Sequence, residues 1–132
     1  MPGCVLRASG DYFQPQGFLD DSDLVPWNVF RKGERKAEKR SWDSSGFTVV
    51  VSEASGDDLA QQIQDAIEFL RMHKEEVARL MRSEGLDYVQ LDFGVNRKNG
   101  FLQSSYLPPE ILSLAGALGV GVEISIYGED EI

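Results

Sequence analysis

The sequence has very little of the chemistry that metal sites and disulfide-stabilised folds require. Its 132 residues include one cysteine, Cys4, and one histidine, His73. A single cysteine cannot form an internal disulfide, and the two residues together cannot supply the nitrogen and sulfur ligands of a usual zinc site. We therefore expect no disulfide framework, no bound metal and no cofactor.

The same scarcity limits nucleophilic catalysis. A catalytic triad needs a base beside the nucleophile and a third group that orients the base. His73 lies on the apolar stripe of a predicted helix, where a backbone carbonyl usually satisfies a histidine. Cys4 lies in the first apolar stretch and is expected to be buried as a small hydrophobic residue. No glycine-rich phosphate-binding motif occurs, and we predict no catalytic residue.

Positive charge is also scarce. The chain has 13 basic residues against 22 acidic ones, which gives a formal net charge of −9. Nucleic acids and anionic membranes attract positively charged proteins, so we expect neither as a partner. The longest weakly polar run, residues 111–122, is too short to cross a bilayer and contains three glycines. The start of the chain lacks the basic and apolar regions of a signal peptide, and we expect a cytoplasmic protein.

What the sequence does have is the composition of one globular domain spanning residues 1–132. Hydrophobic residues make up 42% and charged residues 27%, as in chains that bury a real core. Runs rich in β-branched and aromatic residues predict strands. These runs lie at 4–8, 27–32, 38–43, 47–51, 88–93, 101–106 and 120–127.

One long helix has the clearest periodic pattern. Apolar residues recur at spacings of three and four between Leu59 and Leu80, which places them on one face of an amphipathic helix. Ser55 or Asp57 is expected to cap its start. The pattern is also compatible with a break into two helices near His73.

A shorter helix is predicted over residues 110–118, where prolines open it and Gly119 ends it. Strands that follow one another through short turns favour antiparallel pairing, and an amphipathic helix covers one face of such a sheet. We therefore predict an α+β fold. It consists of a single antiparallel sheet of about six to seven strands, with the long helix on one face and the shorter helix before the last strand.

A basic block stands out in this acidic chain, because six of the 13 basic residues lie within residues 31–40. Such a block is usually a solvated hairpin whose cations protect a sheet edge. The alternative is a site for an acidic partner or an anion, with tryptophan as the anchor. The candidate residues for that site are Trp27, Arg31, Lys32, Arg40 and Trp42.

Two alternating strands carry carboxylates on their polar side. Asp92 accompanies Gln90, and Glu123 accompanies Ser125. If these strands are close neighbours, the four side chains share the face opposite the long helix and form a candidate ligand site. A carboxylate pair there can perform acid–base chemistry or bind a hard cation. The alternative is an ordinary solvated sheet face.

Several short motifs, taken in order, resemble those of a bacterial family catalogued as domain of unknown function 4279. They are RKGE at 31–34, SGFTVVVS at 45–52, LDFG at 91–94, YLPPE at 106–110 and EISIY at 123–127. The motifs span nearly the whole chain. The resemblance implies a bacterial origin and a single α+β domain, and it supplies no catalytic residue.

The acidic charge and the missing catalytic groups favour a non-enzymatic protein-binding module with a basic protein partner. An immunity-type role, in which the domain covers the active site of a basic toxin, is one form of this hypothesis. One alternative is a small-ligand or weak acid–base hydrolase site on the polar sheet face. Another is a structural subunit whose edge strand pairs with its own copy in a homodimer.

Overall fold

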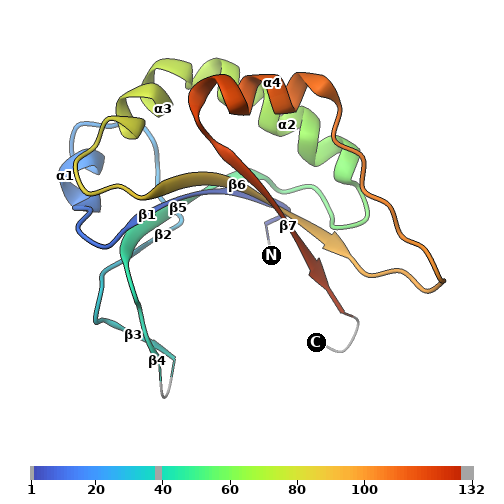
Figure 1. Cartoon of the computed structure of the whole chain (residues 1–132), viewed down its shortest axis with the longest axis horizontal. Helices are drawn as coiled ribbons and strands as arrows, with labels where there is room; N and C mark the ends of the chain where they lie inside the picture. Colours follow the sequence, from blue (N-terminus) through green and yellow to red (C-terminus); the bar gives the residue numbers. More distant parts are fainter. Residues whose placement is uncertain (1, 38–39, 129–132) are drawn as a thin grey trace.

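The computed structural model describes residues 2–37 and 40–128. Its main element is a five-stranded sheet with a layer of helices on one face (Figure 1). In sheet order the strands are β2 (Asn28–Phe30), β5 (Ser45–Ser52), β1 (Cys4–Gly10), β6 (Tyr88–Asn96) and β7 (Gly121–Tyr127). The predicted α+β class, with a mostly antiparallel sheet covered by helices on one face, is confirmed.

The first strand of the chain lies at the centre of the sheet. β1 pairs antiparallel with β5 on one side and with β6 on the other, and β2 extends the sheet beyond β5. β7 is the exception to the antiparallel pattern, because it runs parallel to β6. A parallel pair needs a crossover connection. The helix α4 (Pro109–Leu118) lies within that connection.

Two further short strands form a separate hairpin that projects from the sheet. They are β3 (Arg35–Ala37) and β4 (Arg40–Ser41). The strands are therefore divided between two sheets, whereas the sequence predicted one. Residues 38 and 39 of the strand predicted at 38–43 lie outside the described part of the chain.

The strand predicted at residues 101–106 is wrong, because these residues form no strand. The chain leaves the sheet after Asn96 and crosses to the helical layer, as a parallel β7 requires. The Gln103 side chain accepts a hydrogen bond from the Lys98 backbone N–H and donates one to the Asn96 carbonyl, both at 2.9 Å. This side chain thereby engages the Lys98 N–H and the Asn96 carbonyl, which would otherwise be available for pairing with a strand at 101–106.

The long amphipathic segment forms two consecutive helices that pack on the sheet. The helices of the fold are α1 (Pro15–Leu19), α2 (Leu59–Met72), α3 (Lys74–Met81) and α4. The break falls at His73, whose φ of −107° and ψ of 23° are not helical. Asp58 caps α2 through a hydrogen bond from the Gln61 N–H, so neither predicted capping residue is the cap. None of the described helices has the length and apolar character needed to span a bilayer.

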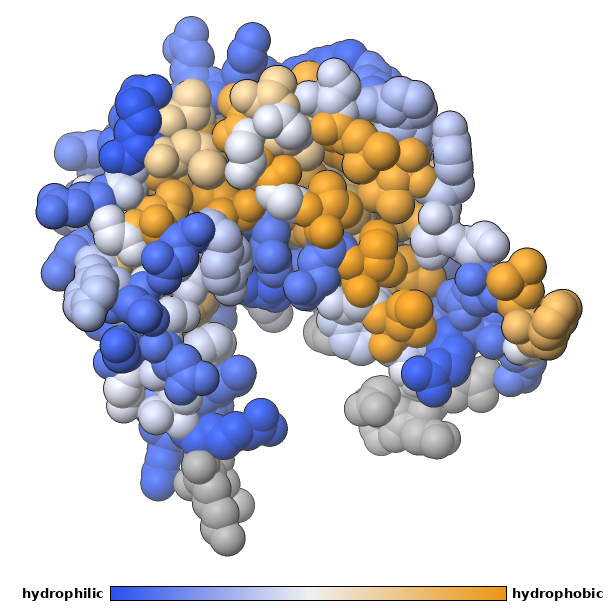
Figure 2. All heavy atoms as spheres, in the orientation of Figure 1, coloured by the Kyte–Doolittle hydropathy of each residue, from blue (hydrophilic) through white to orange (hydrophobic). Residues whose placement is uncertain are grey.

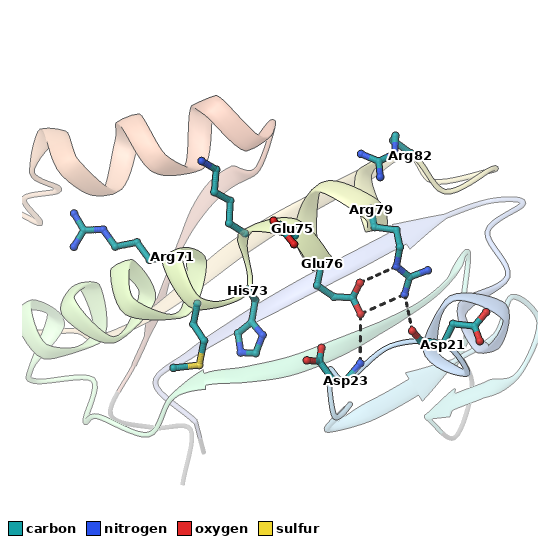
Figure 3. A pocket seen from close by; sticks show the side chains of 10 residues that line it. Asp21, Asp23, Arg71, His73, Glu75, Glu76, Arg79 and Arg82 are labelled. Atoms are coloured by element: carbon teal, nitrogen blue, oxygen red, sulfur yellow. Dashed lines mark hydrogen bonds and ion pairs between the residues drawn. The ribbon is translucent and has the colours of Figure 1, made fainter.

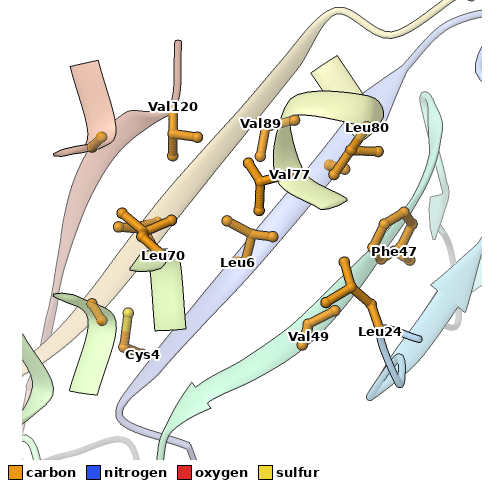
Figure 4. Close-up of a cluster of buried hydrophobic side chains, with 14 of the residues drawn as sticks. Cys4, Leu6, Leu24, Phe47, Val49, Leu70, Val77, Leu80, Val89 and Val120 are labelled. Atoms are coloured by element: carbon orange, nitrogen blue, oxygen red, sulfur yellow. The ribbon is translucent and has the colours of Figure 1, made fainter. Parts of the chain in front are cut away.

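The hydrophobic core lies between the helical layer and the sheet face beneath it (Figure 4). Strand residues such as Leu6 and Phe47 point toward the helices, because the side chains of a strand alternate between its two faces. Leu70 of α2 meets them together with Val77 and Leu80 of α3, and all five are fully buried. Burial of each such side chain contributes roughly 1.5–3 kcal/mol, so this layer supplies most of the folding energy.

The sheet is strongly curved, and its other face lies on the inside of the curve (Figure 1). In the described ranges all helices lie on the convex side, so none covers the inner face. The β3–β4 hairpin projects at one end of the curve, and β7 with the loop after β6 lies at the other. The fold therefore presents a hollowed sheet surface between two projecting ends.

Candidate binding surface

We call the inner, helix-free face of the sheet the concave face. The strand register aligns Arg7 with Thr48 on one side and with Gln90 on the other. Because side chains alternate along a strand, the remaining residues of the concave face follow at spacings of two. From β2 to β7 they include Asn28, Phe30, Gly46, Thr48, Val50, Val5, Arg7, Gln90, Asp92, Gly94, Glu123, Ser125 and Tyr127. The space-filling view shows the hollow between the two projecting ends (Figure 2).

Asp92 is held in place by neighbours on both sides. Its Oδ2 accepts hydrogen bonds from both terminal nitrogens of Arg7 at 3.3 Å, and its Oδ1 accepts one from the Ser125 hydroxyl at 2.7 Å. The residue is only 8% exposed, although it lies on the helix-free face. A buried carboxylate needs a paired charge and hydrogen bonds, and this network supplies both. The three side chains link β1, β6 and β7 into one polar floor.

The structure brings together the four polar residues predicted from the sequence. Gln90 and Asp92 lie on β6, while Glu123 and Ser125 lie on β7, with Asp92 directly beside Glu123 in register. The two carboxylates are therefore neighbours. Both oxygens of Asp92 already accept hydrogen bonds, whereas Glu123 is exposed to solvent.

Aromatic side chains flank this floor at both ends. The Phe30 and Trp42 rings stack with their centroids 4.1 Å apart and 18° between their planes. The Lys36 ammonium lies 4.7 Å from the Trp42 ring centroid, which suits a cation–π contact. At the other end, the Tyr127 ring approaches Gly94 so closely that a Cβ there would lie 3.1 Å from it. The polar floor thus lies between two aromatic borders.

The basic hairpin forms one of these projecting ends. Trp42 follows β4 and belongs to the aromatic stack, and Arg40 is exposed on β4, while Arg31 and Lys32 are exposed between β2 and β3. Trp27 precedes β2 and is 59% exposed. The stacking partner of Trp42 is Phe30. Of the five residues predicted as a partner or anion site, the structure therefore brings Arg40 and Trp42 together at the hairpin. Arg31 and Lys32 precede β3, and the Lys32 ammonium lies 5.7 Å from the Tyr12 ring centroid.

Arg7, Phe30 and Tyr127 are among the members of this surface that were not predicted from the sequence as site residues. Arg7 stands within an otherwise apolar or small-residue strand, and a charge in such a place needs a partner. That signal was present in the sequence, but it did not reveal which carboxylate pairs with it. Phe30 lies beside the basic block in the sequence, but its stacking with Trp42 depends on how the hairpin folds back toward β2.

A second hollow, of about 830 Å³, lies where α2 meets α3 (Figure 3). At its centre, Glu76 of α3 binds Arg79 and a backbone group of the segment after α1. The Arg79 Nε donates to Glu76 at 2.7 Å, and the Asp23 N–H donates to the same carboxylate at 3.3 Å. The hydrogen bond from Arg79 is the main cause that lowers the pKa of Glu76 to about 2. These contacts fasten the segment after α1 to α3, so they have a structural purpose.

The remaining reactive groups are poorly placed for chemistry. Cys4 is fully buried, as predicted, and burial raises the pKa of its thiol well above the usual range. A thiol without thiolate character is a poor nucleophile. Within residues 2–37 and 40–128, no three His, Cys, Asp or Glu side chains are grouped as a metal site would require.

Comparison with known proteins yields one match. A family model described as Domain of unknown function (DUF4279) matches residues 2–129. No curated protein and no solved structure matches the chain. Because the matched segment covers almost the whole sequence, the chain belongs to the DUF4279 family.

Proposed function

We propose that this protein is a non-enzymatic recognition module that binds a segment of another protein on its concave face. The observation that carries the proposal is a curved, helix-free sheet surface whose polar floor lies between aromatic borders. Aromatic anchors beside satisfied polar groups are the features that dominate the energetics of protein–protein interfaces. In this proposal the Phe30–Trp42 stack is the apolar anchor and Lys36 is the adjoining cation.

The floor supports this proposal because its polar groups are already fixed. Arg7 and Ser125 hold Asp92, and the Thr48 hydroxyl donates a hydrogen bond to the Asn28 side chain. Groups that are ordered before binding lose little conformational entropy when the partner arrives. A partner segment can therefore bind across the floor with little rearrangement of the sheet.

The charge distribution supports a basic protein as the partner. Residues 31–40 carry six basic and two acidic side chains, while the rest of the chain carries 7 basic and 20 acidic ones, a net charge of −13. A field of that sign accelerates the approach of a basic protein. The basic hairpin then meets an acidic group on the partner and fixes its orientation. An immunity-type role, in which the domain covers the active site of a basic toxin, fits this arrangement.

The test is affinity capture from extracts of the native host with the immobilised protein, followed by a binding titration with the captured protein. We expect Trp42→Ala to weaken binding at least ~10-fold, because truncation of an aromatic anchor removes a large share of the binding energy. Trp27→Ala is the matched control and should bind like the wild type. Capture of no specific protein, or equal losses in the two variants, contradicts the proposal.

A small polar ligand on the same floor is a second candidate, favoured by the Arg7–Asp92–Ser125 network. A hydrolase that uses Asp92 with Glu123 has less support, because both oxygens of Asp92 are already engaged as acceptors. Calorimetric titration with small organic anions and sugars distinguishes the candidates. Asp92→Asn should abolish small-ligand binding, whereas Trp42→Ala should leave it nearly unchanged.

A further inference from the structure

β7 forms one edge of the main sheet. In the described part of the chain it pairs with β6 and with no other strand. In the view of Figure 1 it lies in front of β6, so its outer side faces the reader. An edge strand carries a row of backbone donors and acceptors that is a ready template for another strand.

The hydrogen bonds of β7 identify which of its backbone groups point outward. The Tyr127 carbonyl accepts a hydrogen bond from the Arg97 N–H at 2.8 Å, so it faces β6. Because N–H and C=O directions alternate along a strand, Val122, Ile124 and Ile126 direct theirs away from β6. These three residues therefore carry the groups available to a new neighbour.

The sequence of β7 has few of the usual protections against such pairing, and Glu123 is its one charged side chain. Its residues, GVEISIY, contain no proline and no lysine, and its pairing with β6 shows no bulge. The opposite edge differs, because β2 is three residues long and Pro26 precedes it. Short edges, prolines and lysines are among the devices that prevent edge pairing, so the β2 edge is better protected than the β7 edge.

An apolar surface accompanies the open edge. Ile126 is 54% exposed, Leu112 of α4 is 49% exposed, and Val122 and Ile124 are partly buried. Figure 2 shows hydrophobic side chains gathered on this side of the molecule. Exposed apolar groups next to an unpaired edge mark an interaction surface.

We propose that β7 pairs antiparallel with β7 of a second copy of this chain, with Ile124 opposite Ile124 on the two-fold axis. This register sets Val122 opposite Ile126, so every outward backbone group meets another, and about six main-chain hydrogen bonds form. It also sets Glu123 opposite Ser125, so the acidic side chains of the two copies are never directly opposed. Main-chain hydrogen bonds form with any extended strand, so the choice of a second copy rests on this side-chain match: apolar residues face apolar residues and Glu123 faces Ser125.

The test is analytical ultracentrifugation of the full chain over a wide concentration range. We expect a mass of about twice 14.7 kDa at high concentration. Ile126→Lys should weaken the dimer at least ~10-fold, because it places a charge on the edge of each copy. Val25→Lys is the matched control, since Val25 is exposed and precedes β2 at the other edge. Circular dichroism verifies that both variants are folded.

The register has its own test. Ile124→Cys places two thiols across the axis at a Cα separation of about 5.5 Å, which suits a disulfide. Oxidation should then link two chains, whereas Tyr127→Cys should not, and the buried Cys4 does not interfere. A wild-type monomer at all concentrations, or a dimer that Ile126→Lys leaves intact, overturns the proposal. Equal crosslinking of the two cysteine variants overturns the register.

Discussion

Arg7 and Asp92 form the ion pair that fixes the polar floor of the sheet, with both terminal guanidinium nitrogens 3.3 Å from one carboxylate oxygen. They lie 85 positions apart in the sequence, on the adjacent strands β1 and β6. The Asp92 side chain is 10% exposed and that of Arg7 is 28% exposed. A pair at this depth is poorly screened by water. Loss of one partner leaves the other charge partly buried and unpaired, which lowers the free energy of unfolding.

Asp92→Asn should therefore lower the free energy of unfolding by about 1–3 kcal/mol, because the Arg7 charge then has no anionic partner. Urea titration followed by circular dichroism measures the change. The control is Glu123→Gln on the neighbouring strand, where an exposed carboxylate should matter by less than about 0.5 kcal/mol. If the two variants are equally stable, the pair does not stabilise the fold.

Gly46 determines whether the aromatic border can form. A Cβ at this position would lie 2.0 Å from the Ala8 carbonyl oxygen and 2.8 Å from the Phe30 ring. Gly46→Ala should destabilise the protein by about 1–3 kcal/mol, because the backbone at Ala8 must shift. It should also change the fluorescence of Trp42, because the Phe30 ring must move. Gly116→Ala is the matched control, since nothing lies within 4 Å of that site in α4. It should leave stability unchanged or raise it by up to about 1 kcal/mol.

The Glu76–Arg79 pair makes the free energy of unfolding vary with pH in the acidic range. The hydrogen bond from Arg79 lowers the pKa of Glu76 to about 2 in the folded protein, below its ordinary value of 4.5. A lowered pKa means that the ionised group stabilises the fold above about pH 4.5, and that this contribution is lost as the pH falls toward 2.

Glu76→Gln should therefore be less stable than the wild type at pH 7, by about 1 kcal/mol for a partly exposed pair. The gap between the two proteins should close as the pH falls from 4.5 toward 2. Urea unfolding at several pH values measures it, with Glu75→Gln as the neighbouring control. A gap that stays constant over this range contradicts the assigned pKa.

Cys4 should be inert toward thiol reagents in the native protein. The thiol is fully buried, and burial raises its pKa, so thiolate and reagent access are both absent. We expect reaction with a disulfide reagent at pH 8 only at the rate of unfolding, and fast reaction in denaturant. Fast labelling of the folded chain would show that β1 opens readily at its start.

The parts of the fold that the sequence predicted are those in which local pattern and tertiary packing agree. The apolar stripe from Leu59 to Leu80 faces the sheet, and its periodicity revealed this without knowledge of the partner. The strand predicted at 101–106 failed because apolar residues there, such as Phe101, are fully exposed and lack strict alternation. Nothing in that stretch signals that the chain crosses over to make β7 parallel to β6.

The candidate surface was predictable only in part, for a related reason. Strand alternation placed Asp92 and Glu123 on the polar face, and the register of β6 with β7 brought them together. The identity of Arg7 as the counterion depends on β1 being central, which no local pattern encodes. The same holds for the contact between Phe30 and Trp42, because it joins β2 to a hairpin of different pairing.

The central position of β1 also has a consequence for synthesis. The ribosome delivers Cys4–Gly10 before the other strands of this domain, yet one of its two neighbouring strands begins only at Tyr88. In a nascent chain, β1 therefore exposes apolar side chains and one unpaired edge until most of the domain has emerged. Interrupted translation would leave a fragment prone to aggregation, so we expect chaperones to retain such fragments.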